Sequence, residues 1–534
     1  MNTITLVTFF VITGIVAMLS WMGTRRTKLN TLSGFFFANR NLGFLTVGSG
    51  LLFANINTVL FVGENELVYT NNMSVMAWGM TSVVAMLIVS EFIMPIYLRT
   101  GIATTPDYLE RRYDRRTKQI VSFIFLINYI VNLLPSVLYG GAIAFNGLFH
   151  FSEIYGIDYW TSVWILVWLM GSVGGIYCLL GGLKAIAVSD MLLGAAMFTG
   201  GLLLPWFGLR FLGDGSLQKG LEVILSSKTE HLNSIGASSD AVPFSTIFTG
   251  MLLVNLYYWG TEQYIVQQVL GSRNLAVCQK GIALACVGKI ISPLLINIPG
   301  LIAVHMYAGM QNTAEVFPKM VSDVSPPFFV GYMAAILFGA TFTTFNAGLN
   351  SSSTLFVLNF YKPWIENRLG PASEKKYLAV AKKFEIIICV LAMCIAPFII
   401  FARNGFYNYL QMVGGLFSVP IFTILLVGFL TRKVPPAAAK AGLLFFIVTY
   451  GLTQTIWDTG LHFLHVLAIL FVTTCLLMLI VGRILPMHTP YQPTLNNIVD
   501  IKPWRQRHWY SAILVITVLL IYFIFSPAVL AKNM

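Results

Sequence analysis

The residues of this chain that could hold an ion or a small solute stand in the middle of otherwise apolar segments. Asn55, Asn57 and Thr58 interrupt one such segment at about mid-membrane depth. Because a hydrocarbon core offers no water to freed backbone groups, a polar interruption there needs partners inside the protein. The segment is either a helix broken in two, whose loosened carbonyls hold an ion or solute, or a continuous helix whose polar side chains bond its neighbours.

A second group of oxygen-bearing side chains follows much later in the chain. Four small residues recur at i, i+3, i+4 and i+7, which places them on one helical face: Ala340, Thr343, Thr344 and Ala347. Two adjacent hydroxyls suit a weakly held monovalent cation, whereas calcium favours carboxylates, which this stretch lacks. The alternative is a small-residue face that lets helices pack closely.

An amide and several aromatic side chains gather near residue 257: Asn255, Tyr257, Tyr258, Trp259 and Gly260. Tyr and Trp offer a flat apolar face and a hydrogen-bond donor, which suits a sugar ring or another planar ligand. Gly260 is a candidate helix break that mirrors the region of Asn55. Ordinary aromatic packing is the alternative.

Two charges fall inside apolar segments. Lys289 is the mid-span lysine, and Asp190 lies in the inner part of a predicted span. A charge at the bilayer centre costs about 2.5–3.5 kcal/mol, so each should face a cavity or a partner. Asp190 could line the route by which an ion leaves toward the cytoplasm. A structural ion pair is the alternative for both.

Composition identifies a polytopic membrane protein, because 57% of the 534 residues are hydrophobic and 10% are charged, against about 25% charged in soluble domains. The six cysteines form no CxxC pair, so the sequence indicates neither a disulfide framework nor a zinc site. The net charge of +12 has no basic domain to hold nucleic acid and is assigned to loops. No phosphate-binding loop motif appears, and no catalytic pair, so neither an ATP-binding subunit nor an enzyme is expected.

Fourteen segments are long and apolar enough to span a bilayer, which predicts an all-α protein with about 14 transmembrane helices. They lie near residues 3–22, 43–70, 74–98, 119–147, 160–180, 184–207, 244–268, 279–307, 327–359, 379–402, 406–429, 436–455, 463–482 and 509–531.

Most of the 33 lysines and arginines fall on alternate connections, which start at residues 23, 99, 181, 269, 360, 430 and 483. These connections are therefore predicted to be cytoplasmic, in an inner (plasma) membrane protein with both termini outside. Basic residues follow the first span rather than precede it, so it is not expected to be a cleaved signal peptide.

The loops also indicate two repeats of opposite orientation, the plan of secondary transporters. Each begins with a polar-interrupted span, and their long second connections lie on opposite sides. The predicted units are 1–42, an extra helix and first cytoplasmic loop; 43–207, the first five-helix repeat; 208–243, an extracellular loop; 244–429, the second five-helix repeat; and 430–534, three accessory helices.

Nearly the whole chain resembles the sodium/solute symporters, and within them the bacterial sodium/sugar branch. Four stretches are most specific: GGLKAIAVSDMLLGAAMFTGG (181–201), NLYYWGTEQYIVQQVL (255–270), QKGIALACVGK (279–289) and LNSSSTLF (349–356). The resemblance implies a leucine-transporter-type core of ten helices in a 5+5 inverted repeat, with one helix before it and three after.

The resemblance also implies site residues. Its sodium site corresponds to the carbonyls of Phe53, Ile56 and Ala340 and the hydroxyls of Thr343 and Thr344, where the family usually has serines, with Asp190 on the sodium exit route. Its sugar site corresponds to Ser82, Asn255, Lys289 and Gln411. Tyr258 corresponds to the inner gate, and Trp78 and Tyr407 to the outer gate.

Three positions depart from the family pattern. Sugar-binding members have a polar residue in place of Leu60 and Glu in place of Gly79, and an outer-gate position that is hydrophobic in them is Glu64 here, with Glu66 nearby. These departures leave the solute open. We expect a sodium-coupled symporter for a sugar or polyol, with sodium as the co-transported ion. A cationic or amino-acid-like solute, or a sensor without transport, is the alternative.

Overall fold

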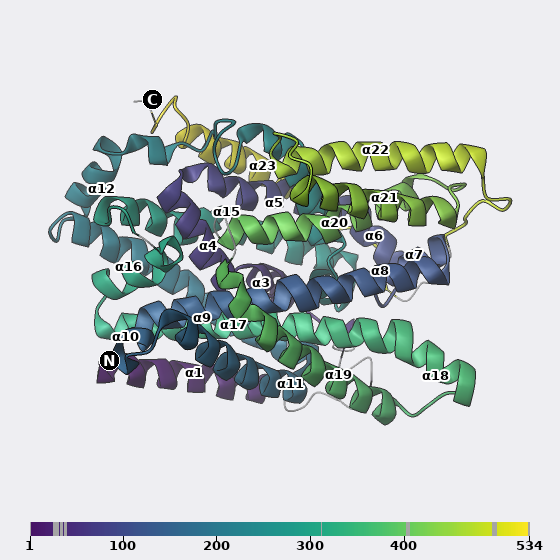
Figure 1. Ribbon diagram of the computed structural model, residues 1–534, viewed down its shortest axis with the longest axis horizontal. Helices are drawn as coiled ribbons and strands as arrows, with labels where there is room; N and C mark the ends of the chain where they lie inside the picture. The colour runs from purple at the N-terminus through teal and green to yellow at the C-terminus, as the bar shows by residue number, and fades with distance from the viewer. Residues whose placement is uncertain are drawn as a thin grey trace.

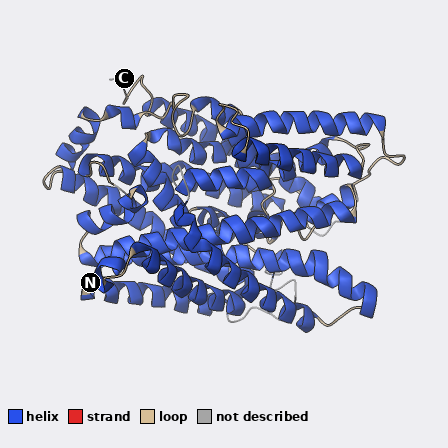
Figure 2. Ribbon diagram, viewed as in Figure 1, coloured by secondary structure: helices blue, strands red, loops and turns tan. Residues whose placement is uncertain are grey.

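The computed structural model describes residues 2–24, 31, 36, 40–310, 312–401, 406–493 and 499–531. Every regular element in these ranges is helical (Figure 2). The start of α1 and the end of α23 lie on the same side as α10, α12 and α16, whereas α7 and α18 lie at the opposite end (Figure 1). This arrangement agrees with an even number of membrane crossings.

The helices have the following bounds: α1 Thr3–Thr24, α3 Phe44–Asn55, α4 Thr58–Thr70, η2 Met73–Met76, α5 Ala77–Ile88, η3 Val89–Ile93, α6 Met94–Thr100, α7 Thr105–Arg112, α8 Arg115–Asn128, η4 Tyr129–Leu133, α9 Leu134–Phe149, α10 Phe151–Tyr155, α11 Tyr159–Leu212, α12 Leu217–Ser226, η5 Thr229–Leu232, η6 Phe244–Phe248, α13 Gly250–Gly260, α14 Gln263–Leu270, α15 Leu275–Met306, η7 Thr313–Glu315, α16 Val316–Val324, α17 Pro327–Phe356, η8 Val357–Tyr361, α18 Lys362–Leu369, α19 Glu374–Ile395, η9 Ala396–Phe401, α20 Phe406–Leu430, α21 Pro436–Thr455, α22 Phe463–Ile484 and α23 Arg507–Ile524.

The described chain holds 12 helical segments that are long and apolar enough to span a membrane, and 13 when the bent pair α3 and α4 counts as one span. The segment predicted at 244–268 is the exception. It consists of α13, with 11 residues, and α14, with 8. At 1.5 Å per residue neither crosses a hydrocarbon core of about 30 Å alone. The chain is interrupted between them at Thr261 and Glu262, which forms a second break.

At each break, the side chain of the residue just before the following helix caps that helix. Between α3 and α4 the chain bends by 52°, and Asn57 caps α4 by accepting a hydrogen bond from the backbone N–H of Leu60. Between α13 and α14, the Glu262 carboxylate accepts from the backbone N–H of Gln263. The broken helix predicted from Asn55, Asn57 and Thr58 is confirmed. The second break falls just after the predicted Gly260.

A helical turn replaces the cytoplasmic loop predicted to start at residue 181. The backbone of α11 is helical from Tyr159 to Leu212. The Tyr177 hydroxyl nevertheless hydrogen-bonds to the Ser189 hydroxyl. A straight helix would separate the Cα atoms of two such residues by about 18 Å, so α11 is sharply bent between them. The spans 159–179 and 191–212 remain distinct.

The central helices surround the breaks, and the accessory helices lie at the edge. In Figure 1, α1 runs along the lower edge and α22 and α23 along the upper edge. Among the spanning segments, α17 is the most deeply buried and α23 the least. α17 packs against the first break, where the Thr58 hydroxyl donates to the carbonyl of Leu337 at 2.8 Å. The polar residues of α17 are therefore held inside the protein.

Candidate functional site

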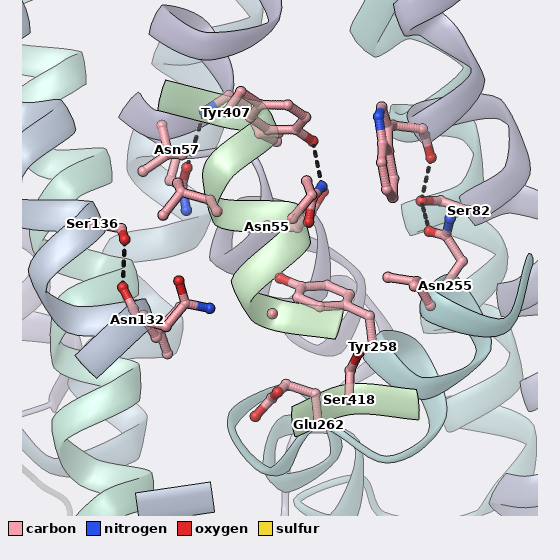
Figure 3. A pocket seen from close by; sticks show the side chains of 18 of the residues that line it. Asn55, Asn57, Ser82, Asn132, Ser136, Asn255, Tyr258, Glu262, Tyr407 and Ser418 are labelled. Atoms are coloured by element: carbon pink, nitrogen blue, oxygen red, sulfur yellow. Dashed lines mark hydrogen bonds between the residues drawn. The ribbon is translucent and has the colours of Figure 1, made fainter. Parts of the chain in front are cut away.

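A cavity of about 190 Å³ lies between the two broken helices (Figure 3). It is smaller than the roughly 300–1,000 Å³ of pockets for drug-sized ligands, so it suits one small solute. The wall is formed by α3, α4, α5, α8, η4, α9, α13, α14, α15 and α20 and by the residues at the two breaks. Its polar and aromatic side chains are Asn55, Asn57, Glu64, Trp78, Ser82, Asn128, Asn132, Ser136, Asn255, Tyr257, Tyr258, Glu262, Tyr264, Lys289, Tyr407, Gln411 and Ser418.

The four residues predicted to bind the solute all line this cavity: Ser82, Asn255, Lys289 and Gln411. The Ser82 hydroxyl donates to Asn255 Oδ1 at 2.6 Å, which joins α5 to α13. The Gln411 side-chain amide donates to the Tyr407 hydroxyl at 3.0 Å. Side chains from four distant parts of the sequence therefore meet at one place.

Lys289 is a buried cation on the cavity wall. Its side chain is almost fully buried, with the residue 3% exposed, and its Nζ donates to Asn55 Oδ1 at 2.7 Å. Since Asn55 is the last residue of α3, this bond ties α15 to the first break. Glu64 on α4 also lines the cavity and interacts electrostatically with Lys289. No ion pair within 4.0 Å joins the two in the described chain.

Aromatic residues stand at the ends of the cavity. Trp78 and Tyr407 meet edge to face with ring centroids 6.2 Å apart. Tyr407 packs so tightly on Gly63 that a Cβ there would lie 2.8 Å from the Tyr407 Cβ. Tyr258 shares a hydrogen bond of 2.6 Å with the Tyr264 hydroxyl. Figure 3 shows Tyr407 at the opposite end of the cavity from Glu262.

The predicted sodium ligands lie where α17 meets the first break. The Thr344 hydroxyl donates to the carbonyl of Ala54 at 3.1 Å, and Ala54 lies between Phe53 and Ile56 in the chain. Thr343 donates to the carbonyl of Ala340 at 3.2 Å. The end of a helix leaves its last carbonyls without helical donors, so oxygen atoms from both elements gather here. They are the hard ligands that a sodium ion takes.

Asp190, predicted on the sodium exit route, has its side chain outside the described residues. The structure therefore leaves that prediction as it stands.

The structure adds Glu262, which the sequence analysis did not single out. It is buried, with 4% of the residue exposed. Its carboxylate accepts hydrogen bonds from the hydroxyls of Tyr129 and Tyr257, the latter at 2.7 Å. An acidic residue at membrane depth two positions after Gly260 was a signal that could have found it.

Three further polar residues of the wall could have been recognised from their spacing in the sequence. Asn128, Asn132 and Ser136 are spaced at i, i+4 and i+8, one helical face, and all line the cavity. The π-helical turn η4 lies among them, and such turns are frequent at functional sites.

The three departures from the family pattern, and Glu66 beside one of them, differ in their surroundings. Leu60 lines the cavity with an apolar side chain. Gly79 faces α15, where an added Cβ would lie 3.3 Å from the Ser292 hydroxyl. Glu66 is buried and accepts from the Thr313 hydroxyl at 2.6 Å. Of the two acidic residues on α4, Glu64 is the one on the cavity wall.

Similarity to a solved structure shows the fold. A sodium-coupled sialic acid symporter in a substrate-bound outward-open state superposes with a TM-score of 0.77 and 17% identity, covering 92% of this chain and all of that one. The predicted leucine-transporter-type fold is thereby confirmed.

Sequence comparisons show the family. An uncharacterized symporter of Escherichia coli K12, YidK, is 39% identical over 505 residues, which cover 95% of this chain and 88% of that protein. A sodium/glucose cotransporter of Vibrio parahaemolyticus is 27% identical over 432 residues, covering 76% and 77%. The model of the sodium:solute symporter family matches residues 35–446. The chain is a multi-pass, sodium-coupled solute symporter rather than an enzyme, and it belongs to the sodium:solute symporter family.

Proposed function

We propose that this symporter imports a sugar or polyol together with sodium by alternating access, with the solute bound between the two breaks. The cavity wall carries the proposal, because it offers amides, hydroxyls and aromatic faces beside the hydroxyl-bearing face of α17. A buried hydroxyl without a partner costs about 1–3 kcal/mol. A solute with many hydroxyls therefore needs a wall of this kind. The name of the Vibrio relative points to the same solute class.

In this proposal sodium binds between the first break and α17. The carbonyls of Phe53, Ile56 and Ala340 and the hydroxyls of Thr343 and Thr344 supply its ligands. The bond from Thr344 to Ala54 supports this placement, because it brings the two elements into direct contact. Asp190 lines the route by which sodium leaves.

Ser82, Asn255, Lys289 and Gln411 bind the solute in this proposal. The Tyr258 ring closes the inner end of the cavity. The outer end is closed by Trp78, Tyr407 and Glu64. The protein lies in the inner membrane with both termini outside, and 43–207 and 244–429 are the inverted repeats. Each break would then belong to the first span of one repeat, so rocking of the repeats would open the cavity to either side in turn.

A cationic or amino-acid-like solute is the second candidate, and Glu64 is the observation that favours it. Its carboxylate on the cavity wall would attract a positive group.

Counterflow in proteoliposomes tests the proposal. Separate samples of vesicles with purified protein are loaded with an unlabelled sugar, polyol, amino acid or amine, and entry of the same compound in labelled form is followed with and without sodium. We expect sodium-dependent exchange of at least one sugar or polyol and none of amino acids or amines. Exchange of an amine or amino acid alone would contradict the solute class.

A further inference from the structure

Glu64 is a buried carboxylate without a close cationic partner. The residue is 4% exposed and lines the cavity. Its polar neighbours on α15 are Lys289 and Asn297, and in the described chain no cationic group lies within 4.0 Å of it. A charge at membrane depth normally faces a cavity or a partner, because burying it alone is costly. Glu64 faces a cavity.

Lys289 presents the opposite charge to the same cavity. Its ammonium has three N–H donors, and one of them is used by Asn55 Oδ1 at 2.7 Å. Opposite charges attract strongly where water is scarce, yet these two do not meet. A ligand that accepts from Lys289 and donates to Glu64 would satisfy both. A pair of neighbouring hydroxyl groups does this, since each hydroxyl is both donor and acceptor.

The third charged residue on the cavity wall, Glu262, already has hydrogen-bond partners within the protein. Glu262 accepts from two tyrosine hydroxyls and one backbone N–H. The two charges left for a solute therefore cancel. A solute with one net charge would find an attractive group and a repulsive one in the same small space.

The uncharged polar groups of the cavity wall favour a polyol over a zwitterion. A zwitterion could match Lys289 and Glu64, but it would leave the hydroxyls and amides of the wall with little to bind. One of them, Ser418, is 5% exposed and its hydroxyl lacks a partner among the described residues. A polyol supplies further hydroxyls for such groups.

We infer that Glu64 binds the solute directly, and that the solute is an uncharged polyol with neighbouring hydroxyls that bridge Glu64 and Lys289. This inference rests on the proposed function and narrows its solute class. It also assigns different tasks to the two acids of α4. Glu66 is held by Thr313 at 2.6 Å and does not line the cavity, so it does not contact the solute.

The matched variants Glu64→Gln and Glu66→Gln test this assignment. Thermal unfolding of the purified protein is followed in sodium while glucose, myo-inositol, serine or choline is titrated. In the unaltered protein, we expect glucose or myo-inositol to stabilise and serine and choline not to. Glu64→Gln should raise the half-maximal concentration of that polyol at least tenfold, since hydrogen bonds to a charged group are about twice as strong as neutral ones. Glu66→Gln should change it less than twofold.

Two further measurements distinguish a loss of solute binding from a loss of folding. Stabilisation by sodium alone should be equal in both variants and the unaltered protein, which shows that they are folded. A deoxy analogue that lacks the hydroxyl bound by Glu64 should bind the unaltered protein more weakly than the parent polyol does. In Glu64→Gln, the analogue and the parent polyol should bind with equal affinity. If polyols bind equally well in Glu64→Gln, the inference is wrong and the proposed function stands. If serine or choline stabilises and polyols do not, the solute class of the proposed function is wrong as well.

Discussion

Thr343 and Thr344 differ in the partners of their hydroxyls. Thr344 donates across to Ala54 of α3, whereas Thr343 donates to Ala340 within α17. A hydroxyl that donates its hydrogen keeps its oxygen lone pairs available to a cation. Both oxygens can therefore bind sodium while they keep these bonds. The Thr344 bond also helps to hold the two elements together, so Thr343 is the cleaner position for a test.

We predict that Thr343→Ala raises the sodium concentration for half-maximal uptake by about tenfold or more, which corresponds to about 1.4 kcal/mol. The loss of one oxygen ligand is the reason. Thr343→Ser keeps the oxygen and should have a small effect. Ser352→Ala is a matched control, because Ser352 is a buried hydroxyl of the same helix bonded to Gly348. Unchanged sodium dependence in Thr343→Ala would remove Thr343 from the site.

At the scale of elements, Glu262 joins the second break to a neighbouring helix. Its carboxylate caps α14 and accepts from Tyr257 of α13 and Tyr129 of η4. We predict that Glu262→Ala destabilises the protein by at least roughly 2 kcal/mol, because a helix cap and two charge-assisted hydrogen bonds are lost together. The fall in unfolding temperature measures this effect.

Two comparisons check the Glu262 prediction. Glu262→Gln keeps an acceptor and should lie between the alanine variant and the unaltered protein. Glu374→Ala removes an exposed acid in the first turn of α19 and should change the unfolding temperature little. An equal fall in Glu262→Ala and Glu374→Ala would contradict the structural role given to Glu262.

The ends of the helices allow a test of orientation. Asp158 at the start of α11 and Lys375 in the first turn of α19 are both exposed. We predict that a cysteine at position 158 reacts with a membrane-impermeant thiol reagent in intact cells and that one at position 375 does not. A cysteine-free background is needed, since Cys394 is exposed. The reverse labelling pattern would overturn the proposed orientation.

The sequence predicted the elements correctly where polar residues interrupt an apolar segment. Asn55, Asn57 and Thr58 indicate the first break because their polar groups need partners there. The bend within α11 gives no such contrast, because Gly181 and Gly182 are typical of a loop although their backbone is helical. For Glu262, the sequence signals an acid at membrane depth, but its tyrosine partner Tyr129 and its place on the cavity wall come only from the fold.

At the scale of the whole molecule, the cavity lies among the central helices and the accessory helices lie around them. α1 and α23 have little of their surface buried inside the protein, and their exposed apolar side chains suit contact with lipid. Removal of solute binding therefore need not disturb the outer helices. In the proposed mechanism, transport requires the cavity to open to either side in turn, and the sodium gradient supplies the energy.

Coupling to sodium limits how far the solute can accumulate. One sodium ion moving down 100 mV supplies about 2.3 kcal/mol, which is roughly fortyfold in concentration. With equal sodium on both sides and a potential of about 100 mV, inside negative, we predict roughly fortyfold accumulation for one sodium ion per solute and the square of that for two. Thr343→Ala at low sodium should slow the approach to this limit without changing it, because the limit depends on stoichiometry and potential alone. Protein-free vesicles set the baseline, and uptake that ignores the potential while needing sodium would contradict this coupling.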